Sequence, residues 1–308
     1  MRPDVFAAVM ATGIVSIAAA DHGFGVISEV LIVIAAVALP VLMYLVARAW
    51  RGFDMRDHNV TLPLFTYVAA CAVVGARLAE HRIVLWVLAG MALQGWLSLA
   101  PLAARSMWRN RWTGLRDRAR GGWELAAVAT SGLSIVFSEL HVLFWAFIFW
   151  VLGLLLYLVM TSLVLWRVRH DASSPELGEP DVWILMGGIA IATLAGDHLH
   201  HIMYPGPIAD AVRAVTIGTW IVATAWIPVL FYVAVRRSVG LGWPAVFPLG
   251  MYSSATYAMA VETGWRWFIG ISLAFFWAAF SAWLIVAVGE LLRFQRLRAA
   301  GTPSDPAT

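Results

Sequence analysis

The stretch FAAVMATGIVSIAAAD at residues 6–21 consists almost entirely of small apolar residues and ends on a carboxylate. Four later stretches repeat this design: LFTYVAACAVVGARLAE at 64–80, LAAVATSGLSIVFSE at 125–139, WILMGGIAIATLAGD at 183–197 and FPLGMYSSATYAMAVE at 247–262. Their terminal acids, Asp21, Glu80, Glu139, Asp197 and Glu262, lie 59, 59, 58 and 65 residues apart. A unit of about sixty residues therefore recurs five times, which is the signature of a repeat architecture.

The composition indicates whether these repeats fold in water or in a lipid bilayer. Of the 308 residues, 61% are hydrophobic and 13% are charged, whereas a soluble domain carries about a quarter charged residues. A membrane-spanning helix needs about 20 largely apolar residues, with about 17 as the lower limit. Ten segments meet or approach that length: 4–20, 26–49, 60–79, 82–104, 122–138, 142–166, 182–197, 208–235, 243–261 and 265–293.

The alternation of small and bulky segments predicts how these helices are arranged. We expect an all-α polytopic membrane protein of ten transmembrane helices, paired as five hairpins around a central pore. Small-residue helices lie inside this arrangement and bulky helices lie outside. Residues 1–298 form one transmembrane domain, and we expect 299–308 to be a disordered cytoplasmic tail, because its composition is too polar to bury.

The basic residues predict the orientation in the membrane. All 21 are arginine, and 17 of them lie on one side of the ten-helix scheme. Cytoplasmic loops carry the excess of basic residues, so both termini are expected inside a plasma or bacterial inner membrane. The positive charge therefore reflects topology, and we expect no nucleic-acid partner. A single cysteine, Cys71, excludes an intramolecular disulfide.

Small and hydroxyl residues gather on the small-residue helices. A purely structural interpretation is that the small residues let helices approach closely and that the hydroxyls hydrogen-bond to the preceding turn of their own helix. As a set, they favour a pore whose weak dipoles suit an ion that must enter and leave. The predicted pore-lining residues are Thr12, Gly13, Ser16, Thr66, Thr130, Ser131, Ser134, Thr193, Ser253, Ser254 and Thr256.

Charged residues gather at the opposite ends of the same helices and predict an outer mouth. Arg77 either forms an i,i+3 ion pair with Glu80 or attracts anions to the mouth. Asp197 and His201, at i,i+4, offer two metal ligands, but spacing places no third, so we assign no metal site and no cofactor. The predicted mouth residues are Asp21, His22, Arg77, Glu80, His81, Glu139, His141, Asp197, His198 and Glu262.

The ninth segment opens with WPAVFPLG at 243–250. Pro248 has no N–H for the Pro244 carbonyl, so the helix should bend there, with Gly250 adding slack. The bend can turn Phe247 toward the axis and make these three residues a gate. The alternative is an ordinary core phenylalanine beside a proline kink.

Two motifs carry a resemblance to a known family. PDVFAAVMATGIVS at 3–16 and WPAVFPLG at 243–250 resemble the tellurite-resistance/dicarboxylate-transporter family, which includes slow anion channels, malate permeases and sulfite exporters. The resemblance implies a quasi-fivefold bundle whose odd-numbered helices line the pore, assembly as a homotrimer, and a pore occluded by Phe247.

We therefore expect a membrane channel or transporter for small organic or inorganic anions, embedded in lipid and not an enzyme. One alternative is a proton-coupled permease for C4-dicarboxylates such as malate, or for sulfite. An alternative of another class is an intramembrane metal or haem enzyme that uses the outer histidine cluster.

Overall fold

The computed structural model describes residues 3–55, 57–109, 112–171 and 179–300. Over these ranges the regular secondary structure is helical, without strands. Five helices coincide with the small-residue stretches: α1 (Ala7–Asp21), α4 (Phe65–Arg77), α7 (Leu125–Glu139), α9 (Ile184–His201) and α11 (Trp243–Thr263). Five longer helices alternate with them: α2 (Gly25–Ala49), α5 (Arg82–Arg109), α8 (Leu143–His170), α10 (Pro207–Arg237) and α12 (Trp267–Ala300).

Short helices connect or precede these elements: η1 (Trp50–Gly52), α3 (His58–Thr61), α6 (Trp112–Arg116), η2 (Gly121–Glu124) and η4 (Pro180–Trp183). The segment expected at 60–79 is split into α3 and α4, because Pro63 lies between them and has no backbone N–H. α12 runs to Ala300, two residues into the expected tail, and 301–308 lie outside the described residues.

Seven helical segments in the described ranges are long and apolar enough to cross a membrane, and α1 is a shorter apolar helix. Residues of the outer helices are mostly exposed: 22% to 33% are buried over the best window of α2, α5, α8, α10 and α12. The corresponding share is 78% for the span containing α4 and 83% for the span containing α9. The chain is thus a polytopic membrane protein in which bulky exposed helices surround buried, small-residue helices.

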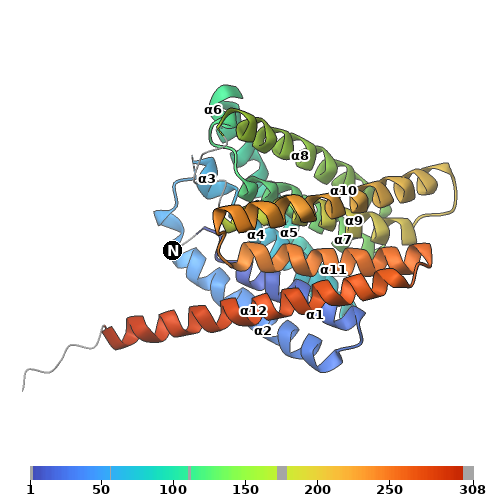
Figure 1. The fold of residues 1–308 in the computed structure, drawn as a ribbon, viewed down its shortest axis with the longest axis horizontal. Helices are drawn as coiled ribbons and strands as arrows, with labels where there is room; N and C mark the ends of the chain where they lie inside the picture. Colours follow the sequence, from blue (N-terminus) through green and yellow to red (C-terminus); the bar gives the residue numbers. More distant parts are fainter. Residues whose placement is uncertain (1–2, 56, 110–111, 172–178, 301–308) are drawn as a thin grey trace, which may run out of the picture.

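The inner helices form a closed ring. α1 packs on α4, α4 on α7, α7 on α9, α9 on α11, and α11 on α1, and each outer helix packs on the inner helix that precedes it (Figure 1). Glycines allow the close approach: a Cβ on Gly13 would lie 2.8 Å from Val73 Cγ1, and one on Gly132 would lie 3.0 Å from Ala72 Cβ. Small residues at such positions are what brings membrane helices into contact.

Hydrogen bonds join each inner helix to the outer ones, in contacts that we call the seams. Trp283 of α12 donates to Thr12 Oγ1 at 2.8 Å, and Trp96 of α5 donates to Thr130 Oγ1 at 2.8 Å. Two further tryptophan donors, Trp220 and Trp150, bond Thr256 Oγ1 and the Ala192 carbonyl in the same manner. Outer-helix tryptophans therefore satisfy polar groups of the inner ring.

The first inner helix begins, and the last outer helix ends, at the same end of the bundle. Figure 1 shows the start of α1 and the end of α12 at one end of the bundle. The inner helices finish at the opposite end, where the repeat carboxylates lie, and we call it the acidic end. This arrangement places the charged candidates of the sequence at one end of the ring.

Candidate functional site

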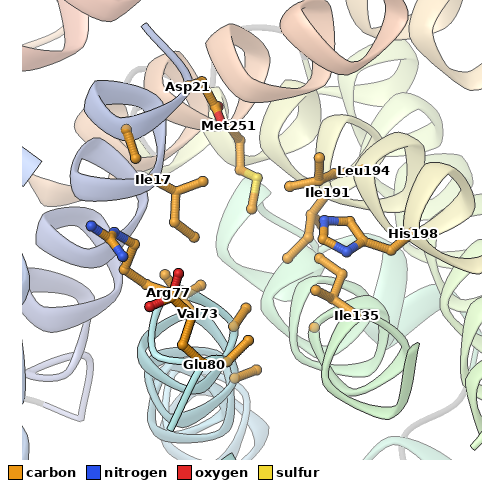
Figure 2. Close-up of a pocket in the computed structure, with 15 residues that line it drawn as sticks. Ile17, Asp21, Val73, Arg77, Glu80, Ile135, Ile191, Leu194, His198 and Met251 are labelled. Atoms are coloured by element: carbon orange, nitrogen blue, oxygen red, sulfur yellow. The ribbon is translucent and has the colours of Figure 1, made fainter. Parts of the chain in front are cut away.

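A cavity of about 280 Å³ opens at the acidic end, and residues of all five inner helices line it (Figure 2). Aliphatic side chains supply most of its wall, among them Ile17, Val73, Ile135, Ile191 and Met251. Its polar lining consists of Asp21, Arg77, Glu80 and His198. The space is therefore an apolar funnel with a few charged groups at its rim.

Arg77 is the arginine of this cavity. Its Nε and Nη2 donate to Ser28 Oγ at 2.9 and 2.8 Å, and that hydroxyl donates in turn to the Ser16 carbonyl at 2.8 Å. Arg77 and Glu80 form no ion pair within 4.0 Å in the described structure, so the i,i+3 pair weighed from the sequence is not formed. A neutral hydroxyl holds the guanidinium, and Asp21, which lines the same cavity, is close enough for its carboxylate to interact electrostatically with Arg77.

His198 occupies the other wall of the cavity, across from Arg77 in Figure 2. Its Nδ1 lies 2.7 Å from Glu139 Oε1, so a carboxylate holds the imidazole. The two donors therefore differ: His198 is matched with an acid, and Arg77 is matched with a hydroxyl. Asp21, on the α1 side, is largely buried, and the hydroxyl of Ser254 on α11 lies beside its carboxylate.

A second cavity of about 310 Å³ adjoins the first, because His198 lines both. Its other lining residues include Glu139, His141, Asp197 and His201. Three imidazoles and two carboxylates thus surround one space at the acidic end. The sequence predicted a histidine-rich mouth but not its division into two cavities.

The remaining predicted mouth residues line neither cavity. His22 Nε2 lies 2.9 Å from Ser272 Oγ of α12, and its ring packs against Tyr257 and Phe276. His81 is exposed. Glu262 pairs with Arg213, whose Nε lies 2.5 Å from Glu262 Oε1.

The predicted pore hydroxyls are buried, but none of them is among the residues that line the described cavities. Ser16, Ser134 and Ser253 donate to carbonyls of the outer helices at 2.7 to 2.8 Å, and Thr66 donates to the Pro63 carbonyl. Thr12, Thr130, Thr193 and Thr256 take part in seam hydrogen bonds, and a Cβ on Gly153 of α8 would meet Ser131 Oγ. Ser254 Oγ is buried beside the carboxylate of Asp21, and Gly13 faces Val73.

Sequence reasoning missed the aliphatic lining and Gly132. Isoleucine, valine and methionine in a buried helix look like ordinary core residues in the sequence. When every face of a helix is apolar, the spacing of its residues does not identify the face toward the axis. The missed residues are Ile17, Val73, Gly132, Ile135, Ile191 and Met251.

The three gate candidates lie just beyond this cavity on α11. Phe247 is fully buried, at 0% exposure, and stands four residues before Met251, which lines the cavity. Residues at i and i+4 share a helix face, so Phe247 lies one turn deeper on the face that Met251 presents. Pro248 packs on Gly187 of α9, and Gly250 packs on Ile14 of α1.

Comparison with known proteins assigns the family. Residues 1–291 match the sequence model of the voltage-dependent anion channels. The chain belongs to that family. An uncharacterized membrane protein of Mycobacterium tuberculosis is 31% identical over 149 residues, which is 44% of this chain and 75% of that protein. An uncharacterized transporter of Methanocaldococcus jannaschii is 26% identical over 193 residues, 56% of this chain and 55% of that one.

Family membership supports the expectation of a membrane anion channel or transporter. It favours transport over the alternative of an intramembrane enzyme. The cavity at the acidic end is accordingly the candidate for the entrance of a transport pathway.

Proposed function

We propose that the chain conducts small organic or inorganic anions along the axis of the inner ring, with the acidic-end cavity as the outer mouth. One observation carries the proposal: a cavity walled by all five inner helices contains an arginine that forms no ion pair within 4.0 Å with a described carboxylate, although Asp21 and Glu80 line the same space. A positive charge in a cleft with low-dielectric walls raises the local concentration of anions. Hydroxyl coordination keeps Arg77 fixed without cancelling that charge.

The proposed pathway implies a topology. All ten long helices cross the bilayer as five hairpins in a quasi-fivefold bundle, and both termini are cytoplasmic, as the arginine bias favours. The shorter inner helices are shielded from lipid by their neighbours, since the outer helices carry the exposed apolar surface. Assembly as a homotrimer is part of the same proposal and rests on the family resemblance.

Phe247 is the proposed closure of the pathway. Its burial and its place one turn below Met251 support a ring that fills the axis beyond the cavity. A phenyl ring offers no donor to replace the water that an anion loses, so such a constriction closes the path by volume and by dewetting. Pro248, held against Gly187, fixes the backbone that carries the ring.

Phe247→Ala tests the closure by anion efflux from proteoliposomes. We expect a large increase in efflux with a stable protein, because the deleted ring faces the pathway. The matched control is Phe276→Ala, which removes an equally buried ring that stacks on Phe24 in the outer layer. That control should cost about 3–5 kcal/mol of unfolding free energy without opening the path. An unstable Phe247→Ala protein with unchanged efflux contradicts the gate.

The same vesicles distinguish a channel from a proton-coupled permease for dicarboxylates or sulfite. For a channel, the reversal potential follows the anion gradient alone. For a coupled carrier it also shifts when a proton gradient is imposed. Chloride, malate and sulfite, tested in turn, define the substrate class.

A further inference from the structure

Three potential metal ligands meet at the acidic end, beside the second cavity. Asp197 and His201 come from α9, and Glu262 comes from α11. Each offers one ligand atom, and these atoms all lie within 4.8 Å of one another. The sequence offered only the first two, because the third depends on the packing of α11 against α9. The fold thus adds a third potential ligand to the two that sequence spacing had offered.

The protein's own donors leave this cluster incomplete. Asp197 exposes 12% of its side chain, and its Oδ1 is buried without a hydrogen-bond partner among the described residues. Its Oδ2 lies 3.7 Å from His201 Nδ1, which is beyond hydrogen-bond range. A buried carboxylate oxygen without a donor is unfavourable, so an ion that supplies the missing charge would stabilise it.

The other two groups remain able to bind an ion. Arg213 contacts Glu262 through Oε1, and the second carboxylate oxygen is left for another partner. His201 Nδ1 lies 2.8 Å from the Asp197 carbonyl oxygen. A hydrogen bond of this kind orients ligating histidines and leaves the other ring nitrogen available. His200 Nδ1 lies 3.7 Å from Glu262 Oε1, so this histidine neighbours the cluster without being one of its three members.

The donor types select the class of ion. Zn²⁺ accepts both imidazole nitrogen and carboxylate oxygen as ligands, as this cluster of one imidazole and two carboxylates offers, whereas Ca²⁺ and Mg²⁺ prefer oxygen ligands alone. Zinc–ligand bonds of about 2.1 Å place tetrahedral ligand atoms about 3.4 Å apart. The ligand atoms, which lie within 4.8 Å of one another, therefore need to approach by up to about 1.4 Å. Rotation of exposed His201 and of Glu262 can supply that movement.

We propose that Asp197, His201 and Glu262 bind a divalent transition-metal ion of the Zn²⁺ class. The ion bridges α9 and α11 at the edge of the second cavity, which shares His198 with the first. It fixes the relative position of two inner helices and adds positive charge beside the proposed entrance. The binding itself does not depend on the anion pathway.

The test is a Zn²⁺ titration of the untagged full chain in detergent, followed by calorimetry. We expect one ion per chain, undiminished by excess Mg²⁺. Asp197→Asn and His201→Gln should each weaken binding by at least about 100-fold, since loss of even an outer-shell partner costs 10–100-fold. The control is His170→Gln. This change removes an exposed histidine at the last residue of α8, away from the acidic end, and should leave the Zn²⁺ affinity unchanged.

A second measurement does not require the variants to fold. Co²⁺ bound to the wild-type chain should give the absorption bands of a low-coordinate site with nitrogen and oxygen ligands, and Zn²⁺ should displace it. Glu262→Gln, which keeps a hydrogen-bond acceptor for Arg213, should alter those bands. Zn²⁺ binding that is equally tight in Asp197→Asn, His201→Gln and the wild type would overturn the proposal, as would an octahedral aqueous Co²⁺ spectrum.

Discussion

The inner helices present two faces that differ in chemistry although both are built from the same small-residue stretches. On the seam face, hydroxyls and indoles are hydrogen-bonded: Ser134 donates to the Ala146 carbonyl, and Trp283 donates to Thr12. On the face toward the cavity, the side chains are aliphatic or charged, as Ile191 and Arg77 illustrate. Neutral polar groups therefore hold the helices of the hairpins together. Charged and bulky aliphatic side chains determine the electrostatics and the width of the space along the axis.

This difference predicts two separable classes of mutant. Changes of axis-face side chains that make no seam bond should alter anion flux and leave unfolding nearly unchanged, because they face a cavity. Arg77 belongs to both faces, since it lines the cavity and bonds Ser28 of α2, so its loss should also lower stability. Changes in the seams should lower stability and leave flux unchanged in the protein that remains folded. Other mutants that mix the two effects would break the comparison.

The largest effect is expected from Arg77→Gln on the axis face. Removing the positive charge from the cavity should lower anion flux by about tenfold at low salt, because focused charge raises entry rates by at least that factor. The difference should shrink at high ionic strength, where the Debye length is short. Efflux from proteoliposomes at two salt concentrations measures both effects.

Arg82→Gln is the matched control for that experiment. Arg82 is also an arginine near the acidic end, but it donates to the Glu139 carbonyl at 2.8 Å and does not line the cavity. Equal loss of flux in both variants would mean that overall charge near the mouth matters and that Arg77 has no special position.

Gly196→Ala probes the seam between α9 and α10. A Cβ there would overlap the Thr216 hydroxyl and lie 3.0 Å from Trp150 Nε1. Overpacking of this kind costs about 1–3 kcal/mol, so the midpoint of thermal unfolding in detergent should fall. Gly218→Ala, with nothing within 4 Å of its Cβ, should instead gain up to about 1 kcal/mol of helix propensity. A neutral Gly196→Ala would show that this seam can separate freely.

Trp283→Phe and Thr12→Val separate a seam hydroxyl from a pore hydroxyl. Each change removes the 2.8 Å bond, and each should lower the unfolding free energy by roughly 0.5–1 kcal/mol, typical of a bond between membrane helices. The double mutant should show coupling, and anion flux should stay at the wild-type level. A specific change of conductance in Thr12→Val alone would return Thr12 to the pore lining.

Most of the fold could be predicted from the sequence because hydrophobic length and side-chain size act locally. Each of the ten expected apolar segments overlaps one of the five inner or five outer helices, and the small-residue segments are the buried ones. Boundaries moved where backbone chemistry intervened, as at Pro63. Seven of the ten predicted mouth residues line one of the two cavities, and their role as a mouth stays a prediction.

The orientation of the hydroxyls could not be predicted, for a physical reason. α1 is buried on nearly every side, so hydrophobic periodicity does not tell whether Thr12 and Ser16 lie on the helix face toward the axis or on the face toward the outer helices. The meeting of Glu262 with His201 depends on the register of α11 against α9, which no local pattern encodes. Long-range packing decides both, and it decides the function of the residues concerned.

The smallest effect is expected at His22, which the sequence placed in the mouth and the structure places in the seam beside α12. Partial burial lowers the pKa of His22 from its ordinary value, although the Ser272 bond opposes the shift. Tyr257 is the titratable group in ring contact with it. Because the unfolded chain binds this proton more readily, the stability held by neutral His22 is present above about pH 6.5 and is lost as the pH falls through the folded pKa. The unfolding midpoint of the wild type should therefore decline between about pH 7.5 and 5.5 more steeply than that of His22→Gln, which keeps a polar group for Ser272 and does not titrate. Parallel curves for the two proteins would show that the seam is insensitive to His22 ionisation, and a matching pH change in anion flux would move His22 from the seam to the axis.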